Sequence, residues 1–336
     1  MTSKINISIL PAGTWGTALA VPLSDNGHNV NLYFRQESDA QSFNIHKQNL
    51  KRLPKVKFNG IVSGTHNLEE AVSQADILVL ACDCVHIRNF FGKIKSSLNK
   101  NTKILCVSKG IEEETNLGMF QVLEQVEPKI SSRLAIMSGP NFAIEVAKRL
   151  PTLTVIASTN KILAKFLQNT FTTSNFRVYT QDDVLGVELG GALKNVIAIG
   201  VGIGDGLKMG ENGRAALITR GIAEMRRLGT SMGAKKQTFT GLSGMGDLIL
   251  SCTSGKSRNY KAGFKIGQGI NPKDLLASDE TIEGLHTVKA AIALAIRKKI
   301  KLPIMETVYK IVYQGISPRQ EFKQLMRFEL SSENGD

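Results

Sequence analysis

A lysine in the middle of a predicted helix is the strongest candidate for chemistry in this sequence of 336 residues. Lys194 lies in the segment GVELGGALKN, and Gly190 and Gly191 precede it by four and three positions on the same helix face. Two glycines inside a helix cost about 1 kcal/mol each relative to alanine, so something has to offset them. Either they clear space beside the Lys194 amine for a ligand, or they let another helix pack closely while Lys194 reaches solvent.

A second group of polar side chains follows in the stretch GMGDLILSCTSGKSRN. Asp247 could pair with a catalytic lysine and set its charge, or it could cap the N-terminus of a helix. Ser257, Arg258 and Asn259 come next, and serine and arginine suit a phosphate dianion. The stretch therefore indicates an anion-binding site close to an aspartate.

The remaining candidates follow two predicted strands. Lys109 comes after ILCV, and Gly139 and Asn141 come after LAIM. Ligands of open α/β sheets bind beyond the carboxyl ends of the strands, and a lysine there can bind phosphate or polarise a carbonyl. Alternatively, Lys109 is an ordinary surface charge.

The elements that hold these residues alternate in the first half of the chain and are helical in the second. Alternating strands and helices predict an α/β Rossmann domain over residues 1–184, doubly wound around a mainly parallel sheet. Amphipathic patterns predict an all-α domain over residues 185–336, joined to the first by the long apolar helix around Lys194. The predicted strands, mostly apolar runs, are Ile5–Leu10, Val30–Phe34, Ile77–Cys82, Ile104–Val107, Leu134–Met137, Leu153–Ala157 and Phe176–Tyr179.

The first strand runs into a glycine-rich turn, ISILPAGTWGTALA. Gly13 and Gly16 take the second and third glycine positions of a dinucleotide fingerprint, where backbone approaches a pyrophosphate and the helix packs on the strand. Pro11 takes the first position and supplies neither an N–H nor a positive φ. The turn therefore either binds a dinucleotide or only connects strand and helix. Pro22 predicts a kink in that helix.

The end of the second strand indicates which dinucleotide would fit. NAD sites usually place an acidic residue there, whereas NADP sites accommodate the 2′-phosphate with arginine. The sequence reads NLYFRQE, with Arg35 at that position and Glu37 two residues later. We therefore predict NADP(H) as the preferred cofactor and NAD(H) as the alternative. Arg35 could instead stack on the adenine or face solvent.

Composition narrows the classes of partner. The net charge of +13 favours an anionic partner such as a phosphorylated small molecule, or reflects a solvated basic surface. The basic residues are scattered and only 6% of residues are aromatic, so we expect no nucleic-acid partner. No apolar run approaches the ~18 residues of a membrane span, so we expect no membrane insertion. The four cysteines and the histidines lack metal-ligand spacing; we expect free thiols, a reducing cytoplasm and no metal.

Seven ordered blocks together resemble the bacterial NAD(P)-dependent glycerol-3-phosphate dehydrogenases. They are AGTWGTALA, VSKGIE, SGPNFAIEVA, GVELGGALKNVIAI, RAALITRGIAEM, GLSGMGDLILSCTS with SRN, and IEGLHT, and they span nearly the whole chain. The resemblance implies a Rossmann domain, a helical domain and often a homodimer. It also implies hydride transfer from NAD(P)H to dihydroxyacetone phosphate, which forms sn-glycerol 3-phosphate for glycerophospholipid synthesis.

The same resemblance implies roles for individual residues. Lys194 would be the acid–base lysine, with Asp247 as its partner. The residues implied to hold the substrate are Lys109, Gly139, Asn141, Lys194, Asp247, Ser257, Arg258 and Asn259. With Gly13 and Gly16 of the turn, the residues implied to contact the cofactor are Thr14, Trp15, Arg35, Lys109, Ala143, Arg258, Ile282 and Glu283.

Some positions depart from the family pattern. Pro11 replaces the first glycine, Pro22 lies in a helix that normally lacks proline, and Asn141 stands where serine or threonine is usual. The segment ACDCV replaces a proline-containing turn. The alternatives are a related two-domain dehydrogenase of hydroxy acids or sugars, and a degenerate nucleotide-binding homologue without catalysis.

Overall fold

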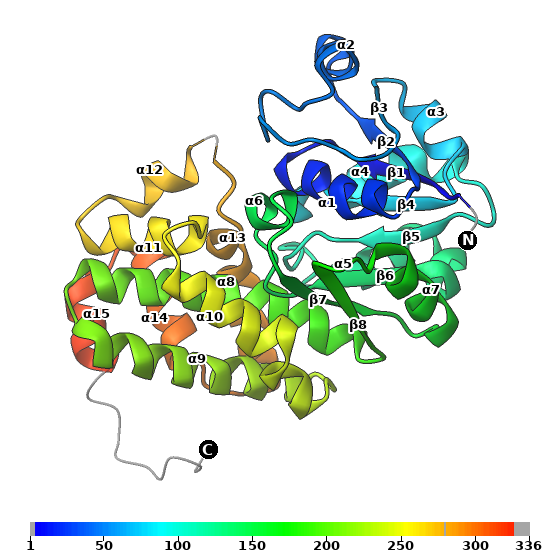
Figure 1. Ribbon diagram of the computed structural model, residues 1–336. Helices are drawn as coiled ribbons and strands as arrows, with labels where there is room; N and C mark the ends of the chain where they lie inside the picture. Colours follow the sequence, from blue (N-terminus) through cyan, green and yellow to red (C-terminus); the bar gives the residue numbers. More distant parts are fainter. Residues whose placement is uncertain (1–3, 279, 326–336) are drawn as a thin grey trace.

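The first half of the chain forms one eight-stranded sheet with helices on both faces (Figure 1). The computed structural model describes residues 4–278 and 280–325. The strands are β1 (Asn6–Leu10), β2 (Asn29–Tyr33), β3 (Val62–Thr65), β4 (Ile77–Leu80), β5 (Lys103–Cys106), β6 (Leu134–Ser138), β7 (Thr152–Ala157) and β8 (Phe176–Gln181). The helices around them are α1 (Thr14–Asp25), α2 (Glu37–His46), α3 (Leu68–Ser73), α4 (Ile87–Ile94), α5 (Met119–Val126), α6 (Ala143–Ala147) and α7 (Lys161–Phe171).

The strand order is β3-β2-β1-β4-β5-β6-β7-β8. The first six strands in this order are parallel, β7 is antiparallel to β6, and β8 is parallel to β7. The order reverses between β1 and β4, which is where doubly wound sheets open a crevice for ligands. The prediction of a doubly wound, mainly parallel sheet is confirmed.

Side chains of the central strands explain why these segments read as continuous apolar runs. In β4, Ile77 and Val79 belong to the apolar cluster on one face of the sheet, and Leu78 and Leu80 to the cluster on the other. The strand is buried on both faces, so no position in it favours a polar residue. The predicted strands lie within two residues of the observed bounds, but β3 was not predicted.

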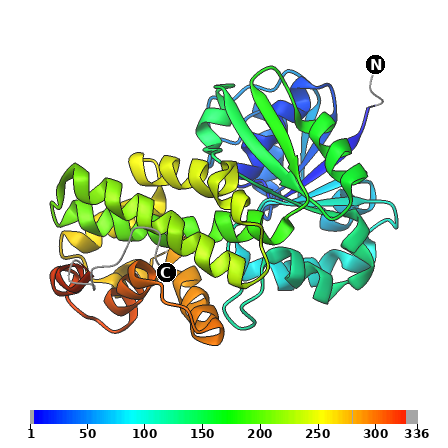
Figure 2. The same ribbon diagram turned by 90° about the horizontal axis from the view of Figure 1, so that it is seen from below.

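The second half of the chain is helical, as predicted. Its helices are α8 (Val184–Gly206), α9 (Gly210–Ser231), α10 (Asp247–Thr253), α11 (Arg258–Gly267), α12 (Pro272–Leu276), α13 (Glu283–Lys298), α14 (Pro303–Tyr313) and α15 (Pro318–Leu325). A π-helical turn, Leu242–Gly246, precedes α10 directly. Helices α9, α10, α11, α13 and α14 all pack on α8, which runs from the sheet into this domain (Figures 1 and 2).

The central position of α8 accounts for its apolar sequence. Within the described residues, α8 is the one helix long and apolar enough to cross a membrane, with a mean hydropathy of 1.6. The prediction of no membrane-length apolar stretch therefore overlooked α8, because Glu188 and Lys194 interrupt its apolar run. However, 94% of its most apolar window is buried inside the protein. Its side chains form the core of the helical domain.

Candidate active site

One carboxylate joins a lysine of the α/β domain to a lysine of the helical domain. Asp247, in the first turn of α10, accepts a hydrogen bond from Lys194 Nζ at 3.0 Å through Oδ1. Its Oδ2 accepts one from Lys109 Nζ at 2.8 Å. The side chains of Asp247, Lys194 and Lys109 are only 3%, 9% and 15% exposed. Asp247 is therefore the buried counter-ion of two cations and not a helix cap.

Lys109 uses all its hydrogen-bond donors in this arrangement. Besides Asp247, its ammonium donates to the carbonyl of Gly139 and to Oδ1 of Asn141, each at 3.1 Å. An ammonium has three N–H groups, so a ligand at Lys109 would have to displace one partner. Asn141 is held in turn, because its Nδ2 donates to Thr154 Oγ1 at 3.1 Å. Lys109 is not the ordinary surface charge considered above.

The ammonium of Lys194 makes two hydrogen bonds, so one of its three N–H groups remains. It donates to Asp247 and, at 2.6 Å, to Ser251 Oγ. Within the described chain no third hydrogen bond of Lys194 is found. Since Ser251 lies one helical turn after Asp247 on α10, both partners approach from the same helix face. The remaining N–H is available to a bound molecule.

Charges of opposite effect meet at these three side chains. Burial raises the pKa of Asp247, but the ammonium groups of Lys109 and Lys194 outweigh it and hold that pKa below its usual value. The pKa of Lys109 is lowered, chiefly by burial and further by the positive charge of Lys194, with Asp247 acting against both. Asp247 is thus ionised at neutral pH, and a proton leaves Lys109 more readily than an exposed lysine.

The two glycines before Lys194 allow close packing. A Cβ atom at Gly190 would lie 2.8 Å from the Ser243 carbonyl oxygen in the π-helical turn. One at Gly191 would lie 2.4 Å from Ser138 Oγ at the end of β6. The close-packing alternative is therefore right about the packing, and protein atoms fill the space that the other alternative left for a ligand. The glycines bring α8 against the sheet and the turn before α10, and Lys194 does not reach solvent.

Close helix packing also places the serine–arginine–asparagine cluster. A Cβ at Gly263 of α11 would lie 2.1 Å from the Ile199 carbonyl oxygen, and one at Gly202 of α8 would lie 2.2 Å from that of Tyr260. The two backbones run in nearly direct contact, and Tyr260 in the first turn of α11 lies beside Gly202, about two helical turns after Lys194 on α8. Free N–H groups at such a helix N-terminus attract anions.

The side chains at this N-terminus differ in how far they are engaged. Ser257 caps α11 by accepting from the Tyr260 N–H at 3.2 Å. Asn259 is buried and accepts from the Gly284 N–H at 2.9 Å through Oδ1, which leaves its amide donors. Burial of its carboxyl group raises the pKa of half-buried Glu283, and the guanidinium of exposed Arg258 opposes this shift.

Ile282 and Glu283 are placed at the start of α13. Ile282 precedes the first residue of the helix and is buried. Glu283 accepts from Asn195 Nδ2 at 2.9 Å, and Asn195 directly follows Lys194 on α8. The structure therefore brings Glu283 close to the lysine pair, although 88 residues separate it from Asn195 in sequence.

The glycine-rich turn closes with Pro11 in the first position. The Leu10–Pro11 peptide bond is cis. The N–H of Ala12 donates to the Tyr33 carbonyl at 2.7 Å, and that of Gly13 to the Pro11 carbonyl at 2.8 Å. None of these bonds needs an N–H on Pro11.

The same turn leaves room for a ligand. A Cβ atom at Gly13 would meet no atom within 4 Å, whereas one at Gly16 would lie 2.5 Å from the Pro11 carbonyl oxygen. No side chain caps the first turn of α1, so its N–H groups are free to face a pyrophosphate. Gly13 and Gly16 thus have the surroundings that the fingerprint requires.

The other residues implied for the cofactor lie around this turn. Thr14 is exposed, and its hydroxyl donates weakly, at 3.4 Å, to the Arg52 carbonyl. Trp15 and Ala143 are half-buried against the apolar cluster on this face of the sheet. Arg35 is exposed, just beyond the end of β2.

The ACDCV segment makes a hydrogen bond to the helical domain. Asp83 Oδ2 accepts a hydrogen bond at 3.0 Å from the hydroxyl of Thr281, just before α13. Burial raises the pKa of the neighbouring Cys82 and Cys84 thiols to about 12, with the charge of Asp83 adding to it at Cys82 and those of Glu283 and Asp83 at Cys84. All four cysteines are buried free thiols. Within the described residues no group of three His, Cys, Asp or Glu side chains could hold a metal.

Comparison with known proteins identifies the family. Residues 6–164 match the family model for the NAD-dependent glycerol-3-phosphate dehydrogenase N-terminus, and residues 183–323 match the model for its C-terminus. The chain belongs to this family. The glycerol-3-phosphate dehydrogenase [NAD(P)+] of Symbiobacterium thermophilum is 45% identical over 96% of this chain and 94% of its own length. That of Fusobacterium nucleatum is 40% identical over 96% of both.

Solved glycerol-3-phosphate dehydrogenases share the fold. The crystal structure of the Coxiella burnetii protein superposes with a TM-score of 0.88 at 34% identity, covering 96% of this chain and 99% of that one. The two-domain arrangement described above is therefore that of the glycerol-3-phosphate dehydrogenases.

Three partners in the site of this glycerol-3-phosphate dehydrogenase family member were not predicted from sequence. Ser251 was within reach, because it lies four residues after Asp247 in a predicted helix. Asn195 was overlooked beside Lys194. Thr154 carried no signal, because it lies near the start of a strand whose antiparallel direction the sequence does not reveal.

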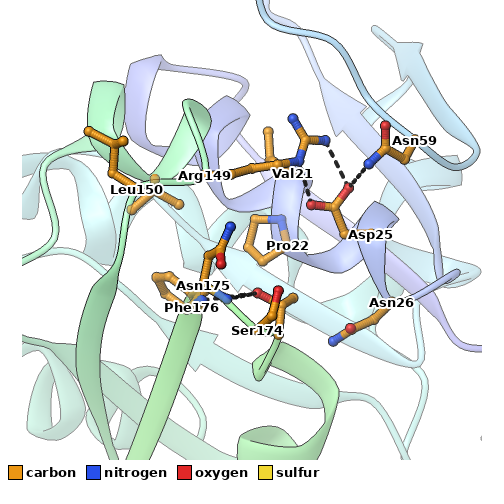
Figure 3. Close-up of a pocket in the computed structure, with 12 residues that line it drawn as sticks. Val21, Pro22, Asp25, Asn26, Asn59, Arg149, Leu150, Ser174, Asn175 and Phe176 are labelled. Atoms are coloured by element: carbon orange, nitrogen blue, oxygen red, sulfur yellow. Dashed lines mark hydrogen bonds and ion pairs between the residues drawn. The ribbon is translucent and has the colours of Figure 1, made fainter.

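Pro22, one of the departures from the family pattern, lies away from the residues around Lys194. Helix α1 continues past Pro22 to Asp25, and Pro22 lines a hollow of about 330 Å³ (Figure 3). Arg149 makes two hydrogen bonds of 2.8 Å with Asp25 at its rim. The hollow is therefore not part of the site around Lys194.

Proposed function

We propose that this chain reduces dihydroxyacetone phosphate reversibly to sn-glycerol 3-phosphate, which supplies glycerophospholipid synthesis. The observation that carries the proposal is that the carboxylate of Asp247 lies between one lysine from each domain. Of these two lysines, only Lys194 has an N–H group left for a ligand. The names of the relatives support the same substrate.

The proton in this reaction is assigned to Lys194. Its remaining N–H would donate to the carbonyl oxygen at C2 as negative charge develops there. The ammonium of Lys109 adds a second positive charge, which would stabilise that oxygen in a site whose side chains are largely buried. Asp247 stays ionised and keeps both amines oriented.

The phosphate is assigned to the first turn of α11. Arg258 supplies a guanidinium, Asn259 supplies its amide N–H groups, and Ser257 fixes the helix start. Holding the phosphate there would orient the carbonyl toward Lys194. Gly139 and Asn141 would act on the substrate indirectly, through Lys109.

The cofactor is assigned to the turn before α1. The open backbone of Gly13 and the uncapped start of α1 fit a pyrophosphate, and Thr14, Trp15 and Ala143 border it. Ile282 and Glu283 would close the nicotinamide end from the other domain. A bound nicotinamide dinucleotide supplies the hydride.

Arg35 supports a preference for NADP(H) over NAD(H), because an exposed guanidinium at the end of β2 suits a 2′-phosphate. Arg35→Ser should weaken NADPH binding about 10- to 100-fold, as expected for loss of a charge-assisted contact. NADH binding should change little. Fluorescence titration of both nucleotides measures this, and equal losses for the two would contradict the preference.

Lys194→Ala tests the assignment of the proton. It should lower kcat by at least about a thousandfold and leave the affinity for NADPH nearly intact. Oxidation of NADPH in the presence of dihydroxyacetone phosphate, followed by absorbance, measures turnover. Turnover near that of the wild type would refute the role of Lys194.

We also propose the setting in which the protein acts. It would be a cytoplasmic homodimer without membrane insertion, consistent with the burial of α8. The domains would divide at 184/185, where α8 begins.

A further inference from the structure

The loop that carries Lys109 is closed on itself and embedded in the other domain. It leaves β5, and Ile111 forms an antiparallel bridge with Gly118 just before α5, so the two ends of the loop lie side by side. Ile111 is 2% exposed and belongs to the core of the helical domain, not to either core of the sheet. The loop that carries Lys109 is therefore packed against the helical domain.

A second contact lies at the edge of this loop. Glu113 accepts from Lys289 Nζ of α13 at 2.5 Å, and His286 lies 3.9 Å from the same carboxylate. The side chains of Glu113 and Lys289 are 36% and 39% exposed. Such ion pairs contribute little in water, so this contact holds the loop weakly.

A third contact is buried and comes from α8 itself. Glu188, six residues before Lys194, accepts from the Phe120 N–H at 2.7 Å in the first turn of α5. A Cβ at Gly118 would lie 2.6 Å from Glu188 Oε2, so the carboxyl group directly faces the end of the loop. Helix N-termini have unpaired N–H groups, and here another domain supplies the acceptor.

The surroundings of Glu188 make a carboxyl group costly. Burial raises the pKa of Glu188 to about 8, and the nearby carboxylate of Glu124 on α5 acts in the same direction. The N–H groups of Phe120 and Met119 oppose this. Within the described residues no lysine or arginine forms an ion pair with Glu188. An apolar side chain at this buried position would pack without this cost.

We propose that Glu188 is a positioning residue that fixes the Lys109 loop, and with it the ammonium of Lys109, relative to Lys194. Both Glu188 and Lys194 project from α8, about 9 Å apart along the helix axis. A rigid helix thus carries the proton donor and the anchor of the second lysine. The effect on turnover rests on the proposed function; the effect on the loop does not.

Glu224 provides a matched control. It is also buried, and it accepts from the Ile304 and Met305 N–H groups at the start of α14, at 2.6 and 3.1 Å. Burial raises the pKa of Glu224 to about 7. Its contact has the same chemistry as that of Glu188 but lies wholly within the helical domain.

The experiment compares Glu188→Ala, Glu188→Gln and Glu224→Ala well below their melting temperatures. Glu188→Ala should lower kcat/KM for dihydroxyacetone phosphate about 10- to 100-fold, because small displacements of a charged group are expensive in catalysis. Glu188→Gln keeps an acceptor for the Phe120 N–H and should stay within about threefold of the wild type. Glu224→Ala should lose stability while kcat/KM stays within about twofold.

Hydrogen exchange supplies a readout that needs no activity. The amides of residues 108–118 should exchange faster in Glu188→Ala and at the wild-type rate in Glu224→Ala. If Glu188→Ala does not fold, Glu188→Asp, with its carboxyl group drawn back, should give the same pattern more weakly. Equal exchange and equal kcat/KM in the Glu188 and Glu224 variants would overturn the proposal. A wild type that does not reduce dihydroxyacetone phosphate would instead refute the proposed function.

Discussion

Asp247 and Glu224 are both buried carboxyl groups, yet their surroundings move their pKa values in opposite directions. Two ammonium groups keep the pKa of Asp247 low despite burial. Burial dominates at Glu224, whose acceptors face only backbone N–H groups within the described hydrogen bonds, and raises its pKa to about 7. The comparison teaches that two nearby ammonium groups keep the pKa of a buried carboxyl group low, whereas backbone N–H groups do not offset burial at Glu224. Of the two carboxyl groups, Asp247 lies in the proposed site.

The largest effect is expected for Asp247→Ala, which removes the charged member of this comparison. It leaves Lys109 and Lys194 buried beside each other without a counter-ion. Breaking a buried pair in this way costs about 3–5 kcal/mol, and we expect turnover to fall at least about a thousandfold. Urea denaturation and steady-state kinetics measure the two effects. A variant with wild-type stability would show that the lysines do not depend on Asp247.

Glu224→Gln sharpens the comparison through pH. Between about pH 4.5, where an unfolded glutamate loses its proton, and pH 7, the folded state still binds it. Stability of the wild type therefore falls as pH rises through this window, by up to about 3 kcal/mol. The amide variant lacks this contribution, so its free energy of unfolding should fall less between pH 4.5 and 7. Parallel pH profiles of the two proteins would contradict the shift.

The smallest effect is expected for Ser251→Ala. Lys194 loses a neutral acceptor at 2.6 Å but keeps Asp247. A hydrogen bond to a charged group contributes about 1.5–3 kcal/mol, and we expect a loss near the lower value with kcat reduced less than about tenfold. Thermal unfolding and kinetics measure both. A loss as large as that of Asp247→Ala would mean that the hydroxyl, and not the charge, holds Lys194.

The sequence predicts the strands of the sheet well where they are buried on both faces. Continuous runs such as β4 leave no doubt about burial, whereas β3 has the sequence VSGT with one buried residue and looks like a loop. Strand direction is not encoded in such a run. The antiparallel direction of β7, and therefore the contact of Thr154 with Asn141, could not be inferred from sequence.

Site residues could be predicted from sequence where they lie close together on one helix or in one short segment. Asp247, Ser257 and Asn259 stood out as a cluster, and Ser251 follows from helical spacing. Glu188 did not stand out, because its partner Phe120 lies 68 residues away in another domain. A polar residue in an apolar helix signals only that a partner exists.

The burial of Ile111 in the helical core has a consequence for engineering and for evolution. Its side chain leaves the sheet-bearing half and completes the hydrophobic interior of the other half. A chimera that joins the first half of one homologue to the second half of another would need a matching socket for this residue. Recombination at the junction before α8 should therefore succeed only between parents whose loop and socket have changed together.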